Sequence, residues 1–159
     1  MNELGAVALK RGKLDEAEAD FRRMLDIYKS VYHDQHYLIG IAVSNLASVE
    51  MERKNFGRAE QLYREAVRRF TETQSTEHLN TGIARIKLGR ALRRARYQEA
   101  EGETLAGYRI LSKQVSPSVS WLKNARKDLA SIYEALHQPE KMKQFQAEIA
   151  AQPSLTAAR

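Results

Sequence analysis

The sequence repeats itself every 42 residues, and this period constrains the fold more than any other feature of the chain. A shift of 42 places Leu4 on Leu46 and on Leu88, and it also places the segment 40–42 on the segment 82–84. After Leu88 the period shortens to 41. A fixed period of this length is typical of a solenoid, in which each unit buries its apolar face only by stacking on its neighbours.

Each repeat unit contains two helical patterns separated by a turn. In the first unit, Leu14, Ala17 and Phe21 recur at helical spacing after a turn at Gly12. Only three prolines interrupt a chain rich in residues that favour helix. We therefore expect an all-α fold with helices near residues 2–11, 14–32, 37–53, 56–74, 78–95, 97–113, 118–136 and 139–150. These helices make four helix-turn-helix units at about 1–35, 36–77, 78–117 and 118–151, which form one array over 1–151 with a flexible C-terminal tail at 152–159.

The composition limits the compartments and partners that suit the chain. Its 26 Lys and Arg residues against 20 Asp and Glu give a formal net charge of +6, which favours acidic partners but is low for a dedicated nucleic-acid binder. No apolar run approaches the roughly 18 residues of a membrane span, and residues 1–10 lack a signal-peptide pattern. The absence of cysteine excludes disulfides and thiolate metal sites. We expect a cytoplasmic protein with no membrane partner.

The units resemble the tetratricopeptide repeat (TPR). Leu-Gly at 4–5 is followed by Glu-Ala at 16–17, and Leu-Gly at 88–89 is followed by Glu-Ala at 99–100. The period of 42 is similar to the long-helix version of the repeat in kinesin light chains, and Ser-Asn-Leu-Ala at 44–47 resembles that subgroup in particular. The resemblance implies a right-handed α-α superhelix whose concave face is lined by the first helix of each pair. It also implies a scaffold that binds a peptide or protein and is not an enzyme.

The C-terminal part, above all residues 133–141, also resembles the repeat arrays attached to bacterial serine/threonine kinases. The chain has no Gly-rich loop, no His-Arg-Asp and no Asp-Phe-Gly, so only the interaction module would be shared. This resemblance implies a bacterial protein, and it leaves open the role of an interaction or regulatory module in a larger signalling protein.

A basic helix is the strongest local feature, because no acidic residue lies between Gly82 and Gln98. The apolar stripe of this helix leaves its cations on the opposite side, toward the expected groove. Arginine pairs bidentately with carboxylates, so one interpretation is a groove for an acidic peptide, and the other is a solvated face. Nucleic acid is the less favoured partner, because no aromatic residues alternate with the cations.

The family resemblance adds polar residues to this surface. The residue before Leu-Gly or Leu-Ala tends to reach the backbone of a bound peptide in the family, and Asn45, Lys87 and Asp128 hold that position here. An amide such as Asn45 can donate and accept at once, which suits a peptide bond. The predicted ligand-binding residues of the concave face are Asn45, Ser48, Lys87, Arg90, Arg93, Arg94 and Lys127.

Metal sites and cofactors are not expected. His33 and His36 are three residues apart beside Asp34, but a zinc site needs three or four ligands. His36 recurs as His78 ahead of the next first helix, which favours a capping or packing role at the junction between repeats. No set of residues for nucleophilic catalysis is evident. Trp121 is expected in the core rather than in a stacking platform, as is Tyr133 of the same helix.

The N-terminal unit is expected to lack a neighbour. Met1 falls inside the expected first helix, so the outer apolar face of this unit has no preceding repeat to cover it. The chain would then be part of a longer array, or it would form a homo-oligomer through this unit.

Overall fold

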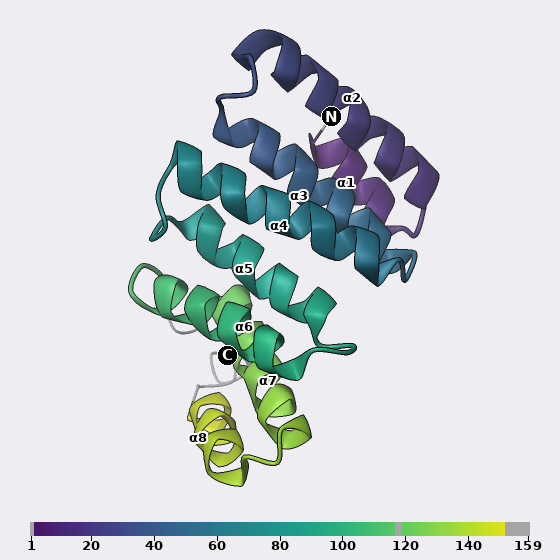
Figure 1. Ribbon diagram of the computed structural model, residues 1–159. Helices are drawn as coiled ribbons and strands as arrows, with labels where there is room; N and C mark the ends of the chain where they lie inside the picture. The colour runs from purple at the N-terminus through teal and green to yellow at the C-terminus, as the bar shows by residue number, and fades with distance from the viewer. Residues whose placement is uncertain (1, 117–118, 152–159) are drawn as a thin grey trace, which may run out of the picture.

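The computed structural model describes residues 2–116 and 119–151, and this part of the chain folds into eight helices without a strand (Figure 1). The helices are α1 (Asn2–Lys10), α2 (Leu14–Tyr32), α3 (Tyr37–Glu52), α4 (Phe56–Thr73), α5 (Leu79–Leu92), α6 (Tyr97–Ser112), α7 (Ser120–Ala135) and α8 (Pro139–Ala150). They form antiparallel pairs stacked in chain order, which confirms the predicted all-α repeat solenoid. The tail predicted at 152–159 lies outside the described residues.

Two histidines begin the first helices of the middle units. The Nδ1 atom of His36 accepts a hydrogen bond from the backbone N–H of Leu38 at 3.3 Å, and Nδ1 of His78 accepts one from the N–H of Asn80 at 3.1 Å. Each histidine has extended backbone angles, as an N-cap residue should. The capping role predicted from the recurrence of this histidine is therefore confirmed.

Small residues allow the two helices of a pair to approach closely. A Cβ atom on Gly5 would lie 2.6 Å from the Phe21 ring, so the aromatic side chain of α2 occupies the space that the glycine leaves. In the third pair, Thr104 replaces the aromatic residue, and a Cβ on Gly89 would lie 2.0 Å from its hydroxyl oxygen. A Cβ on Gly107 would lie 2.5 Å from the backbone oxygen of Gly82. Helices α5 and α6 therefore approach almost backbone to backbone.

A recurring carboxylate joins each unit to the next. Glu18 of α2, Glu60 of α4 and Glu101 of α6 are equivalent under the repeat, and each bonds a cation of the following unit. The partner of Glu18 is Arg53, and hydrogen bonds from Arg53 and Arg22 lower the pKa of the Glu18 carboxyl. Glu60 bonds Arg96, and Glu101 bonds Lys141. Consecutive units are thus held by ion pairs as well as by the apolar core.

Exposed apolar side chains gather on the first pair. Among the described residues, the large hydrophobic side chains that remain exposed are Leu4, Val7, Ile27, Val31 and Tyr32, all in α1 or α2. Self-association through this unit stays a prediction. No helix in the described part of the chain combines the length and apolar character that a bilayer crossing needs.

Candidate ligand-binding pocket

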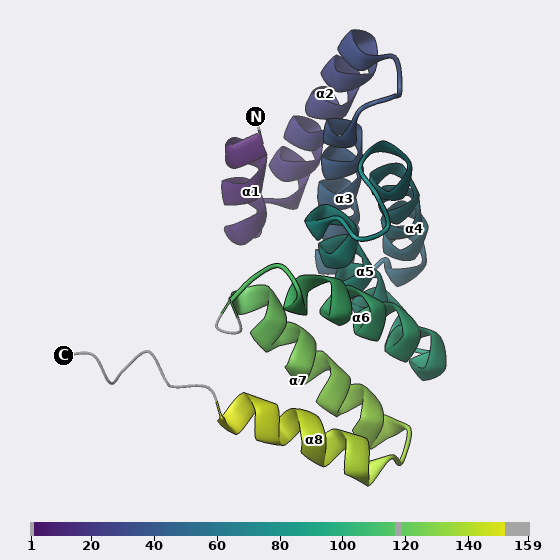
Figure 2. The same ribbon diagram turned by 90° about the vertical axis from the view of Figure 1, so that its left-hand side faces the viewer.

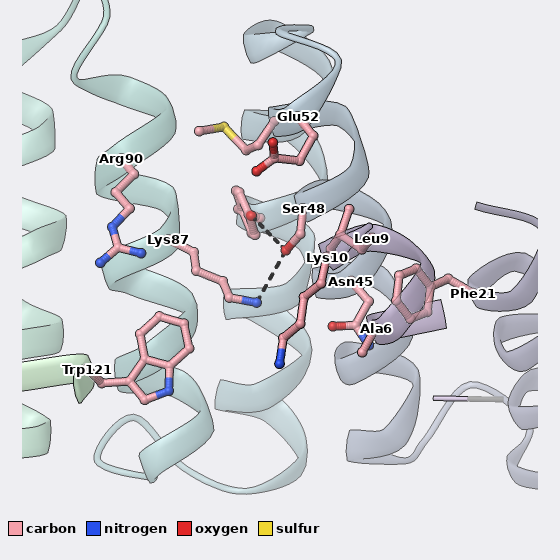
Figure 3. A pocket seen from close by; sticks show the side chains of 12 residues that line it. Ala6, Leu9, Lys10, Phe21, Asn45, Ser48, Glu52, Lys87, Arg90 and Trp121 are labelled. Atoms are coloured by element: carbon pink, nitrogen blue, oxygen red, sulfur yellow. Dashed lines mark hydrogen bonds between the residues drawn. The ribbon is translucent and has the colours of Figure 1, made fainter. Parts of the chain in front are cut away.

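A pocket of about 490 Å³ opens on the face formed by the first helices of the pairs (Figure 3). Figure 2 shows α1 and α7 on the same side of α3 and α5, so the stack curves around this face. Every first helix contributes to the lining, and α2 and α4 contribute Phe21 and Tyr63 at its floor. The lining residues of the first helices are Ala6, Leu9, Lys10, Asn45, Ser48, Met51, Glu52, Lys87, Arg90 and Trp121.

The structure brings four of the seven predicted ligand-binding residues into this pocket. Asn45 and Ser48 come from α3, and Lys87 and Arg90 come from α5. The other three do not line it: Arg93 bonds Asp128, Arg94 is exposed beside Phe56, and Lys127 is exposed on α7. Asn45 and Lys87, which precede Leu-Ala and Leu-Gly in the family pattern, therefore line the pocket. Arg93 and Arg94, at the C-terminal end of the basic run, do not.

Lys87 lines the pocket, and the hydrogen bonds of its ammonium go to hydroxyl groups. Its Nζ atom is 3.3 Å from Ser44 Oγ and 3.4 Å from Ser48 Oγ, and it faces the rings of Tyr63 and Trp121 at 5.9 and 5.7 Å from their centroids. No carboxylate of the described residues bonds it. Burial, with a smaller contribution from the charge of Arg90, lowers the pKa of Lys87 to about 8. The hydroxyls and rings offset part of the cost of burying the ammonium, but no carboxylate of the described residues bonds it as a counter-charge.

The hydroxyl groups around Lys87 form a short chain of hydrogen bonds. Ser48 Oγ donates to the backbone oxygen of Ser44 at 3.0 Å, so the Tyr63 hydroxyl, 3.0 Å away, donates to Ser48. Ser48 can then accept from Lys87 as well. Burial raises the pKa of the Tyr63 phenol to about 12, so this group stays a neutral donor at physiological pH. The chain of hydroxyls positions the lysine without neutralising it.

The arginines of α5 differ from Lys87 because neighbouring helices supply carboxylates for them. Arg90 Nε donates to Asp128 Oδ2 at 2.6 Å, and an Nη atom of Arg93 donates to Asp128 Oδ1 at 3.1 Å. Arg85 bonds Glu103 at 2.7 Å in the same way. The basic run lacks acids within its own helix, yet the carboxylates of α6 and α7 compensate it. Asp128, which the family resemblance placed at a position that reaches peptide backbone, serves as the carboxylate that joins α5 to α7.

Trp121 belongs to the pocket as well as to the core. Its ring packs against buried residues of α5 and α6, but Lys87 and Arg90 also lie over it, each 5.7 Å from the ring centroid. The prediction of a core position was therefore only half of its role, whereas Tyr133 is buried in the core as predicted. The signal was present in the sequence, because Trp121 precedes Asp128 by two helical turns and shares its face of α7.

A second hollow of about 170 Å³ extends the pocket along α3 and α5. It shares Asn45 and Lys87 with the larger pocket and adds Ser44 and Asn80. The side-chain amide of Asn45 donates to the Asn2 side chain at 2.8 Å, which leaves its oxygen able to accept. The two hollows together make a groove of polar side chains and apolar walls, the mixture typical of ligand-binding pockets.

The histidines do not form a metal site in the described residues, where no group of three or more His, Cys, Asp or Glu side chains could hold an ion. His36 instead stacks on Tyr32 with ring centroids 4.0 Å apart. The groove offers hydrogen bonds, lysine cations that no carboxylate of the described residues bonds, and apolar surface, which is chemistry for recognition.

Two tetratricopeptide repeat models match the chain, one over residues 1–37 and the other over residues 38–102. No curated protein is significantly similar to it in sequence. Two crystal structures of Podosopora anserina TPR-like repeats, described as those of a kinesin light chain, share its fold with a TM-score of 0.81, at 20% and 19% identity. They cover 94% of this chain, which in turn covers 71% and 72% of theirs.

The crystal structure of BtubC (BKLC) from P. vanneervenii has a TM-score of 0.78 at 18% identity, and the match covers 98% of this chain and 66% of that one. At these identities the likeness concerns the fold, and the resemblance to arrays attached to bacterial kinases stays a prediction. The repeat period, the stacked helical pairs and the two model matches agree, and we conclude that the chain belongs to the tetratricopeptide repeat family, whose repeats generally mediate protein–protein interaction.

Proposed function

We propose that the groove on the inner face binds a peptide or protein segment, and that an acidic group of this ligand enters the pocket beside Lys87. The observation that carries the proposal is the half-buried Lys87 ammonium with hydroxyl partners and no carboxylate. A cation taken out of water without a counter-charge destabilises the folded protein, and such groups are concentrated at functional sites.

The surroundings of Lys87 suit a carboxylate that arrives from a ligand. Arg90 lines the same pocket and lies over Trp121, so it extends the positive potential although its Nε bonds Asp128. Leu9 and Met51 supply apolar wall, and Asn45 offers an amide to the ligand backbone. A charge-assisted hydrogen bond formed in this partly dry pocket is stronger than one at an exposed lysine.

Other partners receive less support. A nucleic acid would need several cations available together, whereas Arg85, Arg90 and Arg93 bond carboxylates of the protein itself. We accordingly propose a non-catalytic binding role. A cytoplasmic location, a bacterial source and a place in a larger signalling protein stay predictions.

A pair of matched peptide pools tests the proposal. Random fluorescent peptides with a fixed central Glu are compared with the same pools carrying Gln, and binding is measured by fluorescence polarisation. The wild type should prefer the Glu pool by about tenfold, which corresponds to one ion pair of roughly 1.4 kcal/mol. The Lys87→Met variant should lose this preference, and Lys127→Met should keep it. Equal binding of both pools by the wild type, or a preference that survives in folded Lys87→Met, would contradict the proposal.

A further inference from the structure

Lys87 differs from the other lysines whose partners the structure describes. Lys13, Lys113 and Lys141 each bond a carboxylate, as does Lys143. In each of these pairs the ammonium of the lysine is bonded by an anion of the chain. Lys87 has instead the oxygen atoms of two serines, and its Nζ points into the pocket between Trp121 and Ser48 (Figure 3).

We propose that Lys87 is a site of N-acylation by small activated acyl donors, such as acyl phosphates, and that this modification switches the charge of the groove. The amine stands at the wall of a cavity of about 490 Å³, which has room for a small acyl group. The proposed peptide-binding role does not include this modification.

The environment of Lys87 also supplies the reactive form of the amine. With a pKa of about 8, half of the amine is neutral at pH 8, whereas an ordinary lysine has well under one per cent in that form. A less basic amine is a weaker nucleophile, which offsets part of this gain. The gain in neutral fraction, on the order of a hundredfold, exceeds the offset.

The reaction balances without any further reactant. The neutral Nζ of Lys87 attacks the carbonyl carbon of the acyl phosphate, the new C–N bond forms as the C–O bond to phosphate breaks, and the amine proton leaves with the departing phosphate. The product is an uncharged secondary amide and inorganic phosphate.

The pocket accommodates the product because its partners are hydroxyl groups. The amide N–H can still donate to Ser44 or Ser48, and the amide oxygen can accept from a hydroxyl. Acylation of a lysine bonded to a carboxylate would leave that anion without its cation. At Lys87 the modification instead removes a charge that burial disfavours.

Acylation would remove the central cation of the groove, so it should abolish the preference for acidic peptides. This consequence rests on the proposed function, whereas the reactivity of Lys87 does not. The two are therefore separable: labelling needs no ligand, and peptide binding needs no acyl donor.

Acetyl phosphate and peptide-resolved mass spectrometry test the proposal on the folded chain. At pH 8 the initial rate of acetylation at Lys87 should exceed that at the exposed Lys127 by about tenfold, after allowance for lower nucleophilicity. The Lys87 rate should also level off above about pH 8, well below the pH at which the rate of an ordinary lysine levels off. Lys87→Arg keeps the charge and should remove the fast phase. A Lys87 rate equal to or below that of Lys127 across this pH range would overturn the proposal.

Discussion

Helix α5 presents two kinds of cation within two helical turns. Toward its C-terminal end, Arg90 and Arg93 share the carboxylate of Asp128, which comes from the next unit. One turn before, Lys87 meets Ser44 and Ser48 of the preceding unit, and neither can neutralise it. The difference shows that the role of a charge in a solenoid is decided by the facing repeat. The arginines join units together, whereas the lysine has hydroxyl partners but no counter-charge, which we propose a ligand supplies.

The largest change in stability is expected from removing the carboxylate that Arg90 and Arg93 share. Asp128→Ala leaves two arginines facing each other without their carboxylate, so the free energy of unfolding should fall by about 1–3 kcal/mol. Urea unfolding followed by circular dichroism measures the loss. The control is Glu140→Ala, which removes an exposed i,i+3 pair with Lys143 and should change stability by less than about 0.5 kcal/mol. Equal effects of the two substitutions would mean that Asp128 does not join α5 to α7.

Substitution of Lys87 should change the free energy of unfolding in the opposite direction. Lys87→Met replaces a poorly solvated charge with an apolar chain of similar length, so at pH 7 it should stabilise the protein by about 1–2 kcal/mol. The same variant should lose the preference for acidic peptides, a trade of function for stability. A destabilised Lys87→Met would show that the lysine is satisfied in the free protein.

The stabilisation that Lys87→Met produces should also depend on pH. Below about pH 8, Lys87 is charged in both the folded and the unfolded wild type, so the folded state bears the full cost. Between about pH 8 and 10.5 the folded state binds fewer protons than the unfolded state, and the stability of the wild type rises relative to the variant. Urea titrations should therefore show a smaller difference in the free energy of unfolding between wild type and Lys87→Met at pH 10 than at pH 7. An equal difference in the free energy of unfolding at both pH values would argue that Lys87 keeps an ordinary pKa.

The smallest change in stability is expected at Arg94, which neither shares Asp128 nor lines the pocket. Its guanidinium carbon lies 4.7 Å from the centroid of the Phe56 ring, so Arg94→Ala should cost about 0.5–1 kcal/mol of stability. Peptide binding should not change, because Arg94 does not line the pocket. A loss of binding larger than that of Lys87→Met would move the ligand site to the end of α5.

The fold could be predicted from the sequence because the same helical pattern recurs in successive units, so each unit predicts the same pair of helices. Every predicted helix lies within three residues of its observed bounds, and the recurrence of His36 as His78 identified a cap. The pocket was found in part, through the inner-face position shared by Asn45 and Lys87. The pairing of Arg90 with Asp128 was missed because spacing along one helix does not reveal a partner in the next unit. Trp121 was missed because one aromatic ring can serve the core and the pocket together.

A direct titration of Lys87 tests the central claim that α5 carries one unneutralised cation in the groove. Protein labelled with ¹³C-lysine is followed by the chemical shift of the Lys87 Cε atom between pH 6 and 12, and Lys87→Arg assigns the signal. We expect an inflection near pH 8, well below the ordinary lysine value of 10.5. An inflection near 10.5 would show that Lys87 is fully solvated or paired, and it would contradict the claim.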